Sequence, residues 1–136
     1  MDFKVGDRVS VTVQVTDKMV RQFAEVSGDH NPIHLDEEYA KNTRFGRRIA
    51  HGMIAGALIS RALAMELGGE GIYLSQTLKF LKPIFIDDEV TIELYVASAR
   101  EEKGIASIET IVKKTASGEL VVKGDAMIMR GGKFLK

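Results

Sequence analysis

Residues 51–69, HGMIAGALISRALAMELGG, decide the fold that the sequence predicts. The stretch is apolar nearly all round at helical spacing, and its charged residues are Arg61 and Glu66. A helix that hides every face must be wrapped by other structure. Its longest apolar run, 53–67, is shorter than the roughly 20 residues that a membrane span needs. We therefore expect one long central helix, buried inside the domain.

Segments rich in β-branched residues follow this helix and predict strands. Turn sequences such as REEKG and TASGE separate them, so we expect a meander over 72–81, 90–99, 106–114 and 120–129. Ahead of the helix, residues 9–15 alternate valine with polar residues, which is the period of a half-buried strand. The pattern predicts an α+β domain, a curled antiparallel sheet of about five strands wrapped around one long helix.

Short helices are expected between the first strand and the central helix. Asp17 can cap a helix whose apolar stripe includes Val20 and Ala24 and which ends at Ser27–Gly28. A second short helix is predicted over 36–41, before a polar loop that leads to the central helix. These helices would form an overhanging segment beside the sheet.

The composition limits the classes of function. Lysine plus arginine and aspartate plus glutamate number 19 each in the 136 residues, so no net field favours nucleic acid or an anionic membrane as a partner. The chain has no cysteine, which excludes disulfides, thiolate nucleophiles and iron–sulfur clusters. Apolar residues make up 45% and charged residues 28%, as in ordinary globular proteins, and we expect one domain over 1–136. The N-terminal sequence shows no signal-peptide pattern, so a cytoplasmic protein is expected.

The stretch 27–36, SGDHNPIHLD, concentrates residues that can perform acid–base chemistry. Asp29 and His34 lie five residues apart on a segment that Pro32 stiffens and keeps extended or turned as far as residue 33. A second glycine-led turn, His51–Gly52, opens the central helix, whose free N–H groups and dipole can stabilise an oxyanion. A carboxylate, an imidazole and an oxyanion hole are the parts needed to move a proton next to a carbonyl.

Two other interpretations of this stretch compete with acid–base chemistry. Asp29 and Asn31 are also residues that form loops, and His34 would then be a partly buried histidine behind them. His30 and His34 are four residues apart, as metal ligands on a helix would be. Because Pro32 disfavours a helix at this point, we expect no metal site.

A resemblance to a known family adds to this interpretation. FAEVSGDHNPIHLDEEYA, residues 23–40, followed by RRIAHGMIAGALIS, residues 47–60, resembles the MaoC-like, (R)-specific enoyl-CoA hydratase family of hotdog proteins. The resemblance extends over essentially the whole chain. It implies the hotdog fold and syn addition of water to a trans-2-enoyl thioester, giving an (R)-3-hydroxyacyl thioester. No cofactor is implied, since coenzyme A is part of the substrate.

The family's site residues transfer to matching positions of this sequence. The resemblance implies that Asp29 and His34 hold and activate one water, which delivers hydroxide to C3 and a proton to C2. It leaves open which of the two is the base and which is the acid. Asn31 would orient the loop, and the Gly52 N–H would receive the thioester oxygen. Ser60, which lies along the same helix face as Gly52, is a candidate lining residue of the substrate site.

Further side chains are weaker candidates for substrate contacts. Tyr39, Phe45 and Phe80 could line the acyl pocket, although such aromatics are more often core. His51 is a candidate substrate contact or a structural residue at the start of the helix, and His30 is expected in solvent. Basic side chains that are candidates for coenzyme A phosphates, most of them expected on solvated surface, are Arg44, Arg47, Arg48, Lys79 and Lys82.

The resemblance also implies a homodimer, in which sheet edges join and the site lies near the seam. An unpaired sheet edge on a single copy favours association in the same way. The alternatives are a hotdog acyl-CoA thioesterase and a non-catalytic acyl-thioester-binding protein. A thioesterase would be expected to carry a carboxylate on the early central helix, and 53–61 contains none. A sensor would need an output module for which the chain has no residues to spare.

Overall fold

The computed structural model describes residues 3–67 and 71–130. Within them the helices are α1 (Asp17–Ser27), α2 (Pro32–Leu35), α3 (Glu37–Lys41), α4 (Gly52–Glu66) and the 3-10 turn η1 (Glu101–Lys103). The strands are β1 (Arg8–Gln14), β2 (Gly71–Gln76), β3 (Lys79–Phe80), β4 (Glu89–Arg100), β5 (Ile105–Lys114) and β6 (Leu120–Arg130). The long helix and the β-rich second half are thus found where the sequence predicts them.

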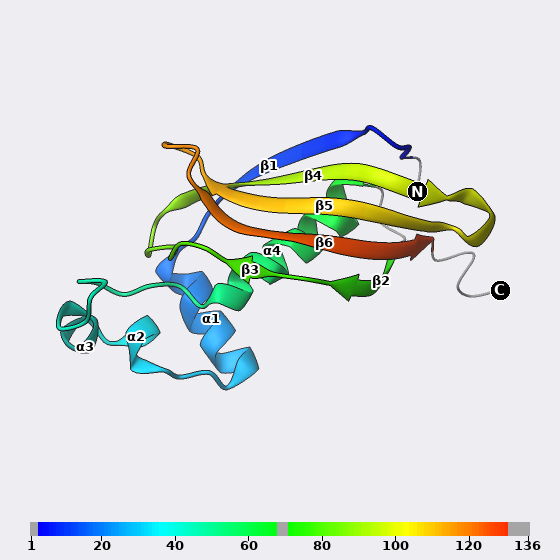
Figure 1. Ribbon diagram of the computed structural model, residues 1–136. Helices are drawn as coiled ribbons and strands as arrows, with labels where there is room; N and C mark the ends of the chain where they lie inside the picture. Colours follow the sequence, from blue (N-terminus) through cyan, green and yellow to red (C-terminus); the bar gives the residue numbers. More distant parts are fainter. Residues whose placement is uncertain (1–2, 68–70, 131–136) are drawn as a thin grey trace.

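The strands form one antiparallel sheet in the order β1-β4-β5-β6-β2, with β3 also paired to β6 (Figure 1). The predicted meander holds for β4, β5 and β6 but is wrong for 72–81, which pairs with β6 and not with the strand that follows it. This segment is also two strands, not one. A Cβ added at Gly124 of β6 would lie 1.8 Å from the Thr77 carbonyl oxygen. The backbone between β2 and β3 therefore passes directly against Gly124, where no side chain would fit.

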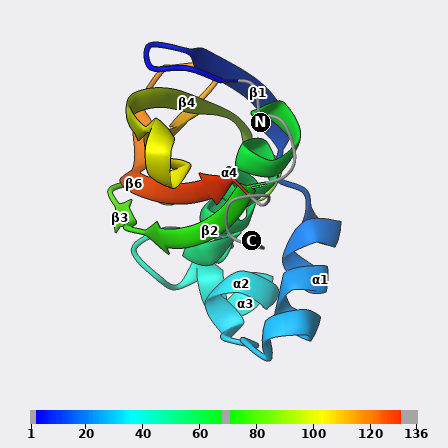
Figure 2. The same cartoon turned by 90° about the vertical axis from the view of Figure 1, so that its right-hand side faces the viewer.

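Helix α4 lies on the concave side of the sheet, which curves around it (Figure 2). Its buried face, formed by Ile54, Ala55, Leu58, Ile59, Ala62 and Leu63, packs into the same core as the inward side chains of β4, β5 and β6. The expectation that every face of the helix is hidden is wrong within a single chain. Met53 is 54% exposed and Met65 is 73% exposed, and Ala57 and Ala64 between them are exposed as well. Apart from the exposed Arg61, this side of α4 is therefore apolar, and none of the residues that the structure describes covers it.

The overhanging segment comprises α1, α2 and α3, which lie together beside one end of α4 (Figures 1 and 2). The N-cap of α1 is Thr16 and not Asp17, because the Thr16 side chain accepts a hydrogen bond from the Met19 N–H. Helix α2 begins at Pro32, although an extended segment was expected there. Proline is favoured at the first position of a helix, where its missing N–H costs no hydrogen bond and its fixed φ suits the helix.

No helix among the described residues is long and apolar enough to cross a membrane.

Candidate active site

The turn that carries Asp29 is built from local side-chain contacts. Gly28 ends α1 with φ 78°, the left-handed conformation that glycine adopts at little cost. The Asp29 N–H then donates to Ser27 Oγ at 3.1 Å, and the Asn31 N–H donates to Asp29 Oδ1 at 3.2 Å. Asp29 itself is exposed. Its carboxylate is therefore oriented by backbone while one face stays open to solvent or substrate.

Asn31 and Pro32 set the start of α2, and with it the position of His34. Asn31 Oδ1 accepts a hydrogen bond from the Ile33 N–H at 3.2 Å, which makes it the N-cap of this short helix. Asn31 thus has the contacts of a loop-orienting residue, as the resemblance implies. His34 lies two residues after the proline and is only 9% exposed.

The His34 ring has a defined neutral tautomer. Its Nδ1 is 2.8 Å from the Ile49 carbonyl oxygen, and because a carbonyl only accepts, Nδ1 carries the proton. Nε2 of the neutral ring is then a free base. Burial lowers the pKa of His34 below its ordinary value of 6.5, an effect that the hydrogen bond to Ile49 partly opposes. The imidazole consequently stays neutral to lower pH than an exposed histidine.

His51 packs against His34 at the start of α4. The two rings stack with centroids 3.9 Å apart and planes inclined by 26°, and the Phe23 ring lies on His51 with centroids 4.8 Å apart. His51 Nε2 donates to the Asp29 carbonyl oxygen at 2.9 Å. Nδ1 is buried and has no hydrogen-bond partner among the described residues. His51 thus links the Asp29 turn to the helix start, and because it also lines the cavity described below, both roles considered from the sequence stay open.

Asp29, His34 and His51 bring their ligand-type atoms, one from each residue, within 4.8 Å of one another. Such a cluster invites comparison with a metal site. A zinc ion binds imidazole nitrogen in the ring plane at about 2.0–2.1 Å. Two rings stacked 3.9 Å apart direct their lone pairs along nearly parallel planes, so these planes do not meet at one ion. The arrangement suits proton transfer between neighbouring groups better than chelation.

A cavity of about 290 Å³ lies beside these residues. Its lining includes His34, His51 and Gly52 together with apolar residues such as Phe80, Ile84 and Val122. Gly52 is the first residue of α4, where N–H groups have no intrahelical acceptor. The Asp29 carboxylate lies just outside the lining, close to the histidine rings. The cavity therefore combines apolar lining with a candidate base and a helix N-terminus.

The fit around Gly52 is close. A Cβ at this position would lie 3.0 and 3.1 Å from two atoms of the Phe80 ring, which projects from β3. A side chain at this position would require the Phe80 ring to give by a few tenths of an ångström. Residue types and spacing in the sequence do not predict this contact, because it joins the helix start to a two-residue strand 28 positions later.

The remaining candidates divide between this cavity and other places. Phe45 and Arg44 line it together with Phe80 and Lys82. Ser60 does not, since it lines a separate cavity of about 160 Å³ between α4 and β2. Outside the lining residues, Tyr39 is 50% exposed, and the His30 ring lies at the surface near Gly28 and Glu25.

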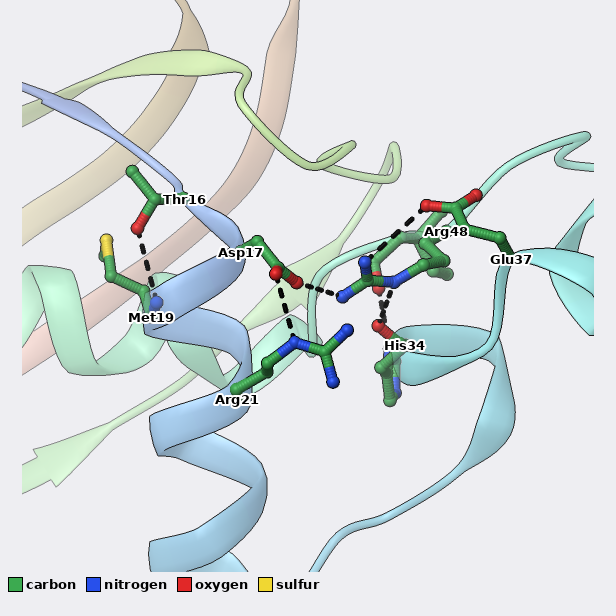
Figure 3. A network of polar contacts seen from close by, with 8 residues as sticks. Thr16, Asp17, Met19, Arg21, His34, Glu37 and Arg48 are labelled. Atoms are coloured by element: carbon green, nitrogen blue, oxygen red, sulfur yellow. Dashed lines mark hydrogen bonds and ion pairs between the residues drawn. The ribbon is translucent and has the colours of Figure 1, made fainter.

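Arg48 is the basic candidate whose environment differs most from the expectation of solvated surface. It is 6% exposed, and its guanidinium contacts Asp17, Glu37 and the His34 carbonyl (Figure 3). An arginine so enclosed is not free to meet a phosphate. A run of basic residues in the sequence could not reveal this, because the partner Asp17 lies 31 positions earlier.

Comparison with known proteins identifies the family. The model of the MaoC like domain matches residues 4–119. The chain belongs to this family. An (R)-specific enoyl-CoA hydratase from Aeromonas caviae is 41% identical over 126 residues, which are 92% of this chain and 93% of that protein. A 3-hydroxybutyryl-CoA dehydratase from Methylorubrum extorquens is 38% identical over 128 residues, covering 93% of this chain and 80% of the relative.

Solved structures of this MaoC-like family have the same fold. The unliganded R-hydratase PhaJ1 from Pseudomonas aeruginosa is similar with a TM-score of 0.89 and 43% identity, covering 95% of this chain and 83% of the other. The hotdog fold and the family that the sequence motifs predict are thereby confirmed.

Proposed function

We propose that this MaoC-like protein is an (R)-specific enoyl-CoA hydratase that adds water reversibly to trans-2-enoyl-CoA. The observation that carries the proposal is the convergence of Asp29, His34 and Gly52 from three separate elements beside one apolar-walled cavity. Relatives at 38–41% identity over most of the chain are named as an (R)-specific enoyl-CoA hydratase and a 3-hydroxybutyryl-CoA dehydratase, names that describe one type of reaction in its two directions.

In the mechanism we propose, one water lies between Asp29 and His34. Neutral His34 Nε2 takes a proton from this water as the oxygen bonds to C3. The C2–C3 π electrons move into the thioester, forming an enolate. The imidazolium then returns its proton to C2 from the same face, which makes the addition syn. The Asp29 carboxylate accepts the second O–H of the water as a hydrogen bond and stabilises the imidazolium.

The enolate oxygen needs a donor, and the Gly52 N–H supplies it in this proposal. The N–H stands at the positive end of the 15-residue helix α4. Stabilisation of developing charge by one such donor is worth about 3 kcal/mol in comparable oxyanion holes. All proton transfers run between the water, His34 and the substrate, so the proposed reaction uses no cofactor. Ser60 remains a proposed lining residue only if a long acyl chain extends to the second cavity.

The uncovered side of α4 supports the further proposal that the enzyme is a homodimer. Met53, Ala57, Ala64 and Met65 are exposed there, with Arg61 among them, so most of this stripe is apolar. Strand β2 lies at the edge of the sheet beside it, with Tyr73 39% and Leu74 41% exposed. An unpaired edge next to an apolar face is a surface that associates with a second copy. Sedimentation velocity should give twice the monomer mass; a monomer at micromolar concentration would contradict the dimer.

The enzymatic proposal is tested by the loss of enoyl-thioester absorbance when the protein meets crotonyl-CoA. The wild type should hydrate it, and Asp29→Asn and His34→Ala should each lose about a thousandfold or more in kcat. His30→Ala is the matched control, an exposed histidine of the same loop that should keep full activity. Release of free coenzyme A without hydration would indicate a thioesterase, and near-normal turnover by either site variant would refute the assignment.

A further inference from the structure

Arg48 is a buried cation that the proposed chemistry does not use. Its side chain, 6% exposed, reaches three elements of the overhanging segment (Figure 3). The guanidinium forms an ion pair with Asp17 at the start of α1, and its Nη1 lies 3.5 Å from a Glu37 carboxylate oxygen in α3. Its Nε–H donates to the His34 carbonyl oxygen of α2 at 2.7 Å. A single side chain therefore joins all three short helices.

Helix α2 depends on such outside contacts. It has four residues, too few for an isolated helix to persist. Residues 48 and 49 contact it three times. Besides the Arg48 bond to the His34 carbonyl, the Ile49 N–H donates to the Ile33 carbonyl at 3.2 Å, and His34 Nδ1–H donates to the Ile49 carbonyl at 2.8 Å. The His34 backbone and ring are thus both held by the Arg48–Ile49 dipeptide.

The same dipeptide leads directly to the oxyanion donor. Ala50 follows and is fixed to the sheet region by its N–H, which donates to the Ile84 carbonyl at 2.7 Å. His51 and Gly52 come next. Only three anchored residues, Ile49, Ala50 and His51, therefore lie between Arg48 and Gly52, which sets the distance between the proposed base and the proposed oxyanion donor.

We infer that Arg48 is a positioning residue for hydration, which fixes the His34 backbone and thereby holds the imidazole in register with the Gly52 N–H. This inference rests on the proposed function. The bond to the His34 carbonyl is the part of the Arg48 network that matters for turnover. The ion pairs with Asp17 and Glu37 anchor the helices and matter for stability. The two roles involve different atoms of the guanidinium and can be separated by substitution.

Arg48→Lys and Asp17→Asn separate them. Lysine keeps the positive charge for the carboxylates but lacks the planar fork that reaches Asp17 and the His34 carbonyl together. Asparagine at position 17 removes the anion while its amide oxygen still accepts a hydrogen bond from Arg48. We expect Arg48→Lys to lose about tenfold to a hundredfold in kcat with KM within about twofold, as for a misplaced catalytic group. Asp17→Asn should lower Tm and keep kcat within about twofold.

Arg8→Lys is the matched control. Arg8 is an exposed arginine of β1, placed over the Tyr95 ring at 4.3 Å, without a contact to α2 among those described. It should leave both kcat and Tm close to wild type. The comparison requires a wild type that hydrates crotonyl-CoA. If the wild type does not, the proposed function fails, and this result is distinct from a failure of the inference about Arg48.

The pH dependence gives a readout that loss of stability alone would not move. The charged and titratable groups facing His34 are His51, Asp29 and Arg48, and the positive charge of Arg48 contributes to lowering the pKa of His34. Arg48→Met should shift the acid limb of the kcat profile to higher pH, whereas Arg48→Lys should leave the limb in place while kcat falls. Wild-type kcat in Arg48→Lys would overturn the inference, and so would an equal kcat loss in Asp17→Asn.

Discussion

The sheet with α4 and the overhanging segment of α1, α2 and α3 are held together by different interactions. In the sheet, the buried polar residues are Thr91 and Thr110, and the other buried residues there are apolar. Beside it, His34, Arg48 and His51 are all buried within about twenty residues of one another in the loop and helices that carry the site. The first region buries only two threonines among its polar side chains, whereas the second buries an arginine and two histidines and satisfies most of their polar atoms with hydrogen bonds.

This difference assigns separate tasks to the two regions. Apolar burial is strong and non-directional, so it can fix a fold without fixing any single atom precisely. Hydrogen bonds are directional and contribute about 1 kcal/mol each, so they orient groups while adding little net stability. Substitutions in the first region should therefore change the unfolding free energy. In the second region, substitutions at the contacts that orient His34 and Gly52 should change turnover, whereas those at the α1 cap or its ion pair, Thr16 and Asp17, should change stability alone.

The largest effect is expected for Ile59→Ala on the buried face of α4. Ile59 is fully buried, so truncation removes its packing and leaves a cavity, at a cost of about 3–4 kcal/mol in unfolding free energy. Urea titration with circular dichroism measures the change. Turnover per folded molecule should stay close to wild type, and a large fall in the activity of the folded fraction would break the separation between the regions.

Gly52→Ala tests the boundary where both regions meet. The new Cβ would lie 3.0 Å from the Phe80 ring, so either the ring gives by a few tenths of an ångström or the helix start shifts, and with it the proposed oxyanion donor. We expect kcat to fall about a hundredfold, close to 3 kcal/mol. The double variant Gly52→Ala/Phe80→Ala supplies space and should recover part of the loss in steady-state assays. No recovery would mean that the Phe80 contact is not the cause.

Thr16→Ala tests the N-cap of α1, which belongs to the overhanging segment. Loss of the hydroxyl that accepts the Met19 N–H at 3.2 Å should cost about 1 kcal/mol in unfolding free energy. The effect should be confined to stability, since Thr16 does not contact the cavity residues described above. Thr12→Ala on β1 provides a comparison, because that hydroxyl caps no helix. Equal losses in the two variants would argue against the capping role.

The smallest effect is expected from pH acting through His34. Its pKa is lowered in the folded protein, so below pH 6.5 the unfolded chain takes up a proton that the folded chain does not. Stability therefore falls as pH drops through 6.5 towards the lower folded-state pKa, and it is unaffected by this group above 7. Urea midpoints at pH 7.5 and 5.5, compared between wild type and His34→Gln, isolate the contribution. An identical pH dependence in both would remove His34 as its source.

Periodicity was sufficient to predict the region held by apolar burial. Valine alternation located β1, and the apolar run 53–67 located α4, because each pattern reports which side chains face the core. The order of the strands was predicted less well. Pairing of β2 with β6 rather than with β4 depends on the long connection 81–88, which no local pattern describes.

For the candidate site, the sequence allowed residues to be named but not their arrangement in space. Asp29, His34 and Gly52 could be named from a motif whose spacing is local. Their arrangement could not, since it depends on contacts such as the one between Arg48 and Asp17, which are 31 positions apart. The family resemblance supplied the roles of these residues, but the tautomer of His34 became visible only with its partner, the Ile49 carbonyl.

The contact between Gly52 and Phe80 has a consequence for how this sequence can change during evolution. A larger residue at position 52 requires the Phe80 ring to move or to be replaced, because even a Cβ would lie only 3.0 Å from it. Substitutions at the two positions should therefore be accepted together rather than singly. Across homologous sequences, residue size at position 80 should decrease wherever position 52 is not glycine, a covariation that joins the helix start to an otherwise minor strand.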